Sequence, residues 1–328
     1  GGSSGGEGAI VGAGGTPFGL GSDIGGSIRM PAFFNGVFGH KPSGGLVPGT
    51  GQYPMAENEA RRFLGTGPIA RSASDLMPVL KILAGPDGVD TSAEVMELGD
   101  PEAVSLEGMR VLSIDGNGVR SVSADLLDAQ SRAATALASR GAVVVHDRIP
   151  GLKRSLDLWS KLMSAAEDTP FASLLGQGKP IAIGWEQMKW FFGRSEHTLP
   201  AIGLANIERL PFVQGGDPVR LFEEVRALRQ EIEERIGPDG VLLYPSYTRT
   251  APRHGRPLFT PIDWVYTAVF NVLELPVTQV PLGLDANGLP LGVQVAGCHG
   301  RDHVTIAAAL ALEAELGGWV PPWIVGCP

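Results

Sequence analysis

Cysteine is scarce in this chain. Its 328 residues include two cysteines, Cys298 and Cys327, and no cysteines and histidines stand together at the spacing of a zinc site. Two cysteines do not make the disulfide framework of a small secreted domain, and a structural zinc site needs four clustered ligands. We therefore expect no disulfide framework and no metal site.

Clustered positive charge and long apolar runs are also absent. The chain has 26 Lys and Arg against 35 Asp and Glu, a net charge of −9, without a basic run. Nucleic-acid binding requires a positive footprint, so no nucleic-acid partner is expected. A bilayer-spanning helix needs about 18 or more consecutive apolar residues, and the sequence contains no such run.

Targeting information is missing as well. No signal peptide is visible, and the chain begins with a glycine-rich motif rather than with Met. We expect it to be an N-terminally truncated piece of a longer protein. Its localisation, cytoplasmic or membrane-associated, is therefore left open.

The rest of the composition is that of a globular protein, with 43% hydrophobic and 19% charged residues. We expect one domain over residues 1–328, loop-rich over residues 1–60. A β-α-β unit, the best local indication of a parallel sheet, is predicted at 109–115, 124–139 and 142–146. Hydrophobic periodicity and turn residues further predict helices at 72–84, 155–210, 218–236, 262–274 and 301–316, strands at 241–244, and a strand pair at 276–283 and 289–296.

Two glycine-rich blocks near the start carry serines. Gly1–Gly6 reads Gly-Gly-Ser-Ser-Gly-Gly, and Asp23–Arg29 reads Asp-Ile-Gly-Gly-Ser-Ile-Arg. Glycine-rich turns expose successive N–H groups that form an anion-binding nest. A hydroxyl beside such a nest can attack a carbonyl while the amides hold the oxyanion. These blocks therefore indicate a serine nucleophile.

The two blocks, in this order and spacing, resemble the amidase signature family. Later segments look like further family blocks: Gly39–Ser43, Gly67–Arg71, Leu243–Ser246 and Gly288–Val295. The subgroup most similar is the type 2 fatty-acid amide hydrolases, on the segments Gly51–Pro54, Asp302–Ala307 and Gly317–Val320. The resemblance covers nearly the full chain but is loose over residues 85–240.

The resemblance implies an α/β fold with a mixed central β-sheet flanked by helices on both faces. It implies a serine amidase that hydrolyses fatty-acid amides through an acyl-enzyme, without metal or cofactor. Ser27 would be the nucleophile, and Ser3, which follows a cis peptide in the family, the proton relay. The oxyanion hole would consist of four backbone amides: Ile24, Gly25, Gly26 and Ser27. Ser4, Asp23 and Arg29 would support the site.

The family's base is a neutral lysine that lies upstream of the first block and thus outside this sequence. We therefore expect the 328-residue chain to be inactive by itself. Lys41 is the nearest lysine, but it matches a block with no base role in the family. A second mechanism takes Ser4 as the nucleophile of a Gly-x-Ser-x-Gly elbow with a histidine base.

Simpler interpretations stand beside these. Ser27 could cap the following helix, and Asp23 with Arg29 could be a solvated surface pair. The aromatic segment 185–192 is interpreted either as a core helix or as a contact with a membrane or acyl chain. For the whole protein, a small-amide amidase, a non-catalytic lipid-amide-binding fragment and a glutamine amidotransferase subunit stay open, as does a homodimer.

Overall fold

The structure is a computed structural model, and it describes residues 2–53, 56, 58–166, 171–179, 181–207, 217–260 and 262–325. Cys327 lies outside these residues. The centre of the fold is an eight-stranded sheet in the order β1-β3-β2-β7-β8-β6-β4-β5. The strands are β1 (Phe18–Asp23), β2 (Phe38–Lys41), β3 (Gly65–Ala70), β4 (Arg110–Ser113), β5 (Val143–His146), β6 (Val241–Pro245), β7 (Val277–Leu284) and β8 (Pro290–Gly297).

The sheet is mixed. β4 runs parallel to both β5 and β6, and all other neighbours pair antiparallel. The predicted β-α-β unit is confirmed as β4, α5 (Ala124–Ser139) and β5. The predicted strand pair is the β7–β8 hairpin, in which the Asp285 carboxylate accepts hydrogen bonds from the N–H groups of Asn287 and Leu289.

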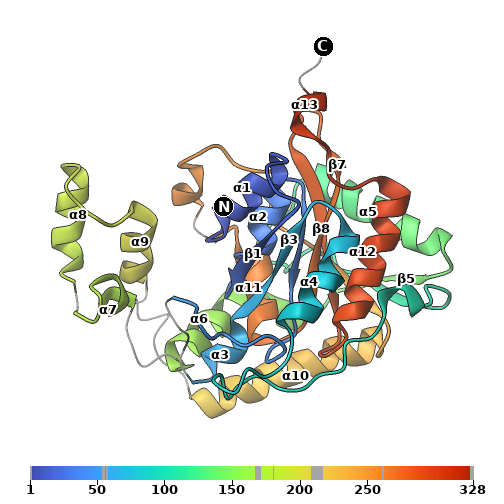
Figure 1. Cartoon of the computed structure of the whole chain (residues 1–328), viewed down its shortest axis with the longest axis horizontal. Coiled ribbons are helices and arrows are strands. Elements are labelled where there is room, and N and C mark those ends of the chain that lie inside the picture. The colour runs from blue at the N-terminus through green and yellow to red at the C-terminus, as the bar shows by residue number, and fades with distance from the viewer. Residues whose placement is uncertain are drawn as a thin grey trace.

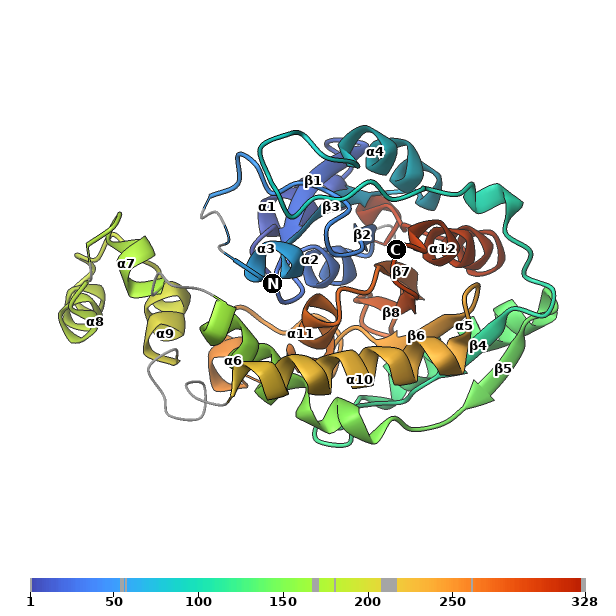
Figure 2. The same ribbon diagram turned by 90° about the horizontal axis from the view of Figure 1, so that it is seen from below.

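Helices cover both faces of the sheet. Alternate residues of β6 belong to different cores: Leu243 packs in the cluster that contains residues of α5 and α12 (Asp302–Leu316), and Leu242 in the one that contains residues of α10 (Pro218–Ile236) and α11 (Val265–Val272). Figure 2 shows α12 and α10 on opposite sides of the strands. The expected α/β architecture, a mixed sheet flanked on both faces, is confirmed.

The chain contains further helices among the described residues. They are α1 (Gly5–Gly12), α2 (Arg29–Phe34), α3 (Ala60–Phe63), α4 (Leu76–Leu83), α6 (Ser155–Ala166), α7 (Phe171–Leu175), α8 (Ile183–Phe191), α9 (Leu199–Ile207) and α13 (Pro322–Val325). Short 3₁₀ turns occur at Ala73–Asp75, Pro101–Ala103, Pro150–Arg154 and Arg256–Phe259. In both ribbon views α7, α8 and α9 project away from the body of the molecule (Figures 1 and 2).

The helices predicted from the sequence agree best with the structure where the hydrophobic periodicity is strong. The helices predicted at 124–139 and 218–236 coincide with α5 and α10. The expectation that residues 1–60 are loops with short helices is wrong in part, because β1 and β2 lie there and β3 follows. These strands are short and rich in glycine, which disfavours a strand from local propensity alone.

Glycine in β3 has a packing reason. A Cβ on Gly67 would overlap the carbonyl oxygen of His40 in the neighbouring strand. The β2–β3 approach therefore requires the absence of a side chain at this position.

We predict that Gly67→Ala lowers the free energy of unfolding by about 2 kcal/mol or more, because a well-packed ladder resists the shift that a methyl group demands. The matched control is Gly184→Ala in α8, where a Cβ meets no atom within 4 Å. There alanine adds about 0.5–1 kcal/mol through helix propensity. Urea unfolding of both variants measures the difference. Equal stability of the two would contradict the steric argument.

Candidate active site

The candidate nucleophile lies in the turn that joins β1 to α2. β1 ends at Asp23 and α2 begins at Arg29. Ser27 is half-buried, and its hydroxyl makes no hydrogen bond within the part of the chain that the structure describes. The N-cap of α2 is Ile28, so the interpretation of Ser27 as a helix cap is wrong.

The first glycine-rich block packs directly against this turn. The Ser4 N–H donates to the Ser27 carbonyl oxygen at 3.3 Å. A Cβ on Gly2, whose φ is +67°, would lie 3.3 Å from the Ser27 Cα. Ser3, which is exposed, is the residue between Gly2 and Ser4, the two residues that make these contacts. The structure thus brings together the two serine blocks that the sequence analysis singled out.

Ser4 is placed differently from its neighbour. It is buried, and its Oγ donates to the Ser22 carbonyl at 3.3 Å and accepts from the Ser22 N–H at 3.2 Å. A hydroxyl held by backbone on both sides fastens the start of α1 to β1. No histidine among the described residues bonds to Ser4, so the elbow mechanism finds no support in this geometry.

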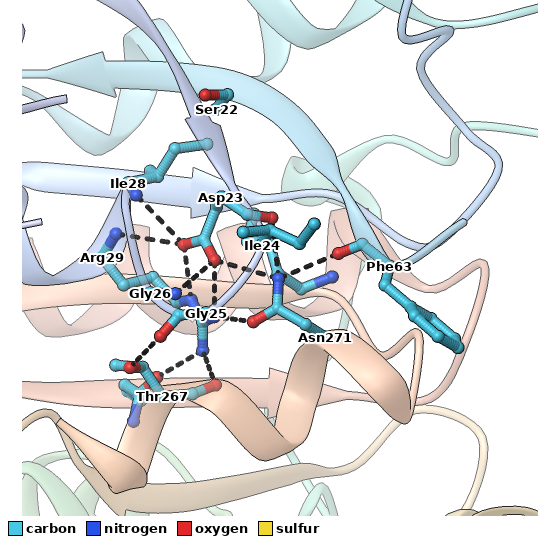
Figure 3. A network of polar contacts seen from close by, with 12 residues as sticks. Ser22, Asp23, Ile24, Gly25, Gly26, Ile28, Arg29, Phe63, Thr267 and Asn271 are labelled. Carbon is cyan, nitrogen blue, oxygen red and sulfur yellow. Dashed lines mark hydrogen bonds and ion pairs between the residues drawn. The ribbon is translucent and has the colours of Figure 1, made fainter. Parts of the chain in front are cut away.

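A buried ion pair braces the turn (Figure 3). The guanidinium of Arg29 bonds both oxygens of Asp23, Nη2 to Oδ1 at 2.8 Å and Nε to Oδ2 at 3.0 Å. Both side chains are fully buried, so the interpretation as a solvated surface pair is wrong. The carboxylate also accepts the Gly26 N–H at 2.7 Å and the Ile28 N–H at 3.1 Å. The pair therefore fixes the backbone on both sides of Ser27.

Burial alone would raise the pKa of Asp23. The charge and hydrogen bonds of Arg29, the amide of Asn271 and the charge of Lys41 together outweigh it and hold that pKa well below its usual value. Asp23 is consequently a carboxylate at any working pH, and its part is to hold charge and geometry rather than to move protons.

Residues from the other end of the chain complete this network. Asn271 Oδ1 accepts from Arg29 Nη2 at 2.7 Å, and Gln294 Oε1 accepts from Arg29 Nη1 at 2.8 Å. The Thr267 carbonyl accepts from the same Nη1 at 2.8 Å. The sequence alone does not indicate these three residues, because partners 238 or more positions away from Arg29 leave no local signal.

The four predicted oxyanion amides are not equivalent. The Gly26 N–H is already donated to Asp23 Oδ1, which departs from the expectation that it faces the substrate. The N–H groups of Ile24, Gly25 and Ser27 donate to no other described residue. Three unengaged amides beside an unengaged hydroxyl are the arrangement that can hold a developing oxyanion.

Lys41 is buried (1% exposed), and its ammonium donates to the Pro42 carbonyl at 2.6 Å. Desolvation, aided by the charge of Arg29, lowers the pKa of Lys41 to about 7. No carboxylate in the described ranges lies within ion-pair distance of Lys41. The lysine is thus deprotonated easily, but its nitrogen is engaged with backbone rather than with either serine.

His40, the next candidate base, belongs to a second buried network. Its Nε2 lies 3.0 Å from Asp302 Oδ1 and its Nδ1 2.9 Å from Thr278 Oγ1. Ser43 donates to Asp302 Oδ2 at 2.6 Å. Here the aspartate stands between serine and histidine, so the histidine cannot take the serine's proton. This cluster fastens β2 to α12.

The aromatic segment is exposed rather than buried. Trp185, Met188 and Phe192 are 58%, 52% and 67% exposed, and Phe191 is 79% exposed. The interpretation of 185–192 as a core helix is therefore wrong. No helix within the described residues is long and apolar enough to cross a membrane.

The structure offers no second candidate site among the cavities and metal-ligand clusters of the described residues. A cavity of about 580 Å³ between residues 99–110 and the α10–β6 turn contains none of the candidate site residues. Among the described residues, no group of three or more His, Cys, Asp or Glu side chains could hold a metal ion.

Comparison with known proteins identifies the class. The Amidase family model matches residues 1–306, and the chain belongs to the Amidase family. It is 47% identical over 334 residues to fatty-acid amide hydrolase 2-A of Danio rerio, which covers 98% of this chain and 61% of that protein. Human fatty-acid amide hydrolase 2 is 44% identical over 334 residues, again with 98% of this chain and 61% of the relative covered.

Solved structures agree on the fold. A 6-aminohexanoate cyclic dimer hydrolase is 24% identical with a TM-score of 0.74, covering 100% of this chain and 69% of that one. The peptide amidase of Stenotrophomonas maltophilia, 23% identical with a TM-score of 0.72, covers 98% and 66%. The amidase signature fold expected from the sequence is confirmed.

We predict a pH-dependent stability that Lys41 controls. Its folded pKa of about 7 lies below the value of 10.5 expected when it is exposed. Between these values the unfolded chain binds a proton that the folded chain does not, so the free energy of unfolding rises as the pH is raised from 7 towards 10. Below pH 7 Lys41 is protonated in both states, and burial of its ammonium lowers the free energy of unfolding by the full amount, on the order of a few kcal/mol.

Lys41→Met should therefore raise the unfolding free energy at pH 7 and flatten its rise above that pH. The control is Lys81→Met on the exposed side of α4, which should leave the pH dependence as in the unchanged chain. Chemical denaturation between pH 6 and 9.5 measures both. A Lys41→Met curve that runs parallel to the parent curve would refute the assignment.

Proposed function

We propose that the chain is the nucleophile-bearing part of a serine amidase that hydrolyses fatty-acid amides. One observation carries the proposal: in a turn braced by a buried ion pair, the Ser27 hydroxyl and three backbone amides beside it donate to no described residue. The likeness to fatty-acid amide hydrolases 2 supports the substrate class. Because the chain spans 61% of those relatives, activity and substrate are proposed for the whole protein.

In the proposed reaction Ser27 Oγ forms a bond to the amide carbonyl carbon. Its proton passes to the Ser3 hydroxyl, which gives its own proton to a neutral lysine. The carbonyl oxygen becomes an oxyanion on the amides of Ile24, Gly25 and Ser27. Collapse breaks the C–N bond, and the leaving nitrogen takes the proton back through Ser3. Water then attacks the acyl-enzyme by the same route and releases the fatty acid.

The lysine in this scheme lies outside the 328 residues. Lys41 does not fill the role, because its nitrogen is buried and bonded to the Pro42 carbonyl. General-base catalysis typically contributes ~10²–10⁴-fold. The chain alone should therefore turn over amides slower than the longer protein by about that factor.

The exposed aromatic side chains of α8 are proposed as the contact with the acyl chain or with a lipid surface. Exposed aromatic rings, here Trp185, Trp190 and Phe191, suit the boundary between water and lipid. Within the same proposal the ligand is a small-molecule lipid amide.

We predict that Ser27→Ala abolishes labelling by a fluorophosphonate probe and amide hydrolysis in a protein that also carries the upstream lysine. Folding should be unaffected, since the hydroxyl makes no hydrogen bond to a described residue. Ser3→Ala should retain a trace of activity, because a water can bridge to the lysine. The matched control is Ser4→Ala: labelling that survives in Ser27→Ala and vanishes in Ser4→Ala would revive the elbow mechanism.

We predict that kcat/KM rises with acyl-chain length by up to about fourfold per methylene before levelling off, as burial of ~0.8 kcal/mol per methylene requires.

The double variant Phe191→Ala, Phe192→Ala should lose about tenfold or more in affinity for phospholipid vesicles. Ile82→Ala, at an exposed position on α4, is the control. A flat chain-length profile would favour a small-amide or glutamine amidase, and unchanged vesicle binding would remove the lipid role of α8.

A further inference from the structure

Every carbonyl that precedes a predicted oxyanion amide is held by a hydrogen-bond donor. The four bonds are Asn271 Nδ2 to Asp23 O at 2.7 Å, Trp159 Nε1 to Ile24 O at 2.7 Å, Thr267 Oγ1 to Gly25 O at 2.6 Å, and Met30 N to Gly26 O at 2.8 Å. Figure 3 shows the bonds of Thr267 and Asn271 to this turn.

The geometry of the peptide unit gives these bonds a consequence. A peptide is planar and almost always trans, so its C=O and N–H point in opposite directions. A donor that fixes the carbonyl of one residue therefore fixes the direction of the next residue's N–H. A hydrogen bond to a carbonyl also polarises the whole unit and strengthens its N–H as a donor.

Gly26 shows the rule at work. The carbonyl of the preceding residue, Gly25, accepts a hydrogen bond from Thr267. The Gly26 N–H of the same peptide points to the opposite side and donates to Asp23 Oδ1 at 2.7 Å. The same rule applied one peptide earlier concerns Ile24. Its carbonyl bonds Trp159, and the Gly25 N–H on the far side of that peptide is one of the three unengaged amides.

Trp159 differs from the other three donors in origin and exposure. Thr267 and Asn271 are fully buried and belong to the ion-pair network, and the Met30 bond is backbone of α2. Trp159 comes from α6, is half-buried, and stacks edge-on against Trp264 with ring centroids 4.9 Å apart. A Cβ on Gly25 would lie 3.3 Å from the Trp159 ring, so the indole both bonds and covers this peptide.

We propose that Trp159 is a positioning residue: its indole N–H holds the Ile24–Gly25 peptide so that the Gly25 amide is aimed at the oxyanion. This rests on the proposed amidase function. The bond exists before substrate arrives, so it stabilises the oxyanion without reorganisation in the transition state. It would therefore affect kcat and leave substrate affinity nearly unchanged.

The test removes the N–H while keeping the ring. Trp159→Phe is introduced into the protein that carries the upstream lysine, and kcat, KM and the affinity for a trifluoromethyl ketone analogue of the substrate are measured. The ketone forms a hemiketal with Ser27 that mimics the oxyanion. We expect kcat and ketone affinity to fall together by about 10–100-fold, less than the ~10²–10³-fold typical of losing a donor outright. KM should change less than about twofold.

The matched control is Trp264→Phe, which alters the same aromatic pair without touching a bond to the turn, and it should keep kcat near the parent value. If Trp159→Phe fails to fold, 3-benzothienylalanine at position 159 replaces only the N–H with sulfur and repeats the measurement.

The outcomes separate the two proposals. Parent-like kcat and ketone affinity in the position-159 variants, or an equal loss in Trp264→Phe, would overturn the positioning role while Ser27→Ala still abolishes labelling. A fall in thermal stability with higher KM and constant ketone affinity would make Trp159 a structural residue only. Labelling that persists in Ser27→Ala would overturn the amidase proposal itself.

Discussion

The buried ion pair between Asp23 and Arg29 is the constraint on which the site depends. Two fully buried charges are costly unless their hydrogen-bonding capacity is satisfied. Here the carboxylate receives backbone N–H groups from the nucleophile turn as well as the guanidinium, and the remaining guanidinium hydrogens are taken up by α11 and β8. The charge pair thus obliges the turn, the helix and the hairpin to meet in one arrangement.

The same field reaches the neighbouring lysine. Lys41 lies on β2, close enough for the positive charge of Arg29 to add to the desolvation that lowers its pKa to about 7. One arginine therefore keeps Asp23 ionised and helps to lower the pKa of Lys41. Arg29 thus contributes to a lower pKa at both groups, since a fixed positive charge favours an anion beside it and disfavours a second cation.

The sequence predicts this protein well where a signal is local. Both serine blocks, the helix at 218–236 and the hairpin after residue 276 follow from motif spacing, periodicity and turn residues, and the resemblance built on the motifs leads to the correct fold. Prediction from the sequence fails where packing between distant segments decides the structure. β3 contains two glycines and a proline, and its close approach to β2 depends on the absence of a side chain at Gly67. Trp159, Thr267 and Asn271 sit in ordinary helices, and only the folded chain shows that their donors converge on one turn.

The span of the ion-pair network also sets the order in which the site can be assembled. Arg29 and its partner Gln294 are 265 residues apart, and synthesis at ~5–20 residues per second separates their emergence by roughly 13–50 s. During that time the nucleophile turn has no hairpin or α11 to close upon. The turn that carries the proposed nucleophile can therefore be braced in its final form only after the segment that carries Gln294 has been made.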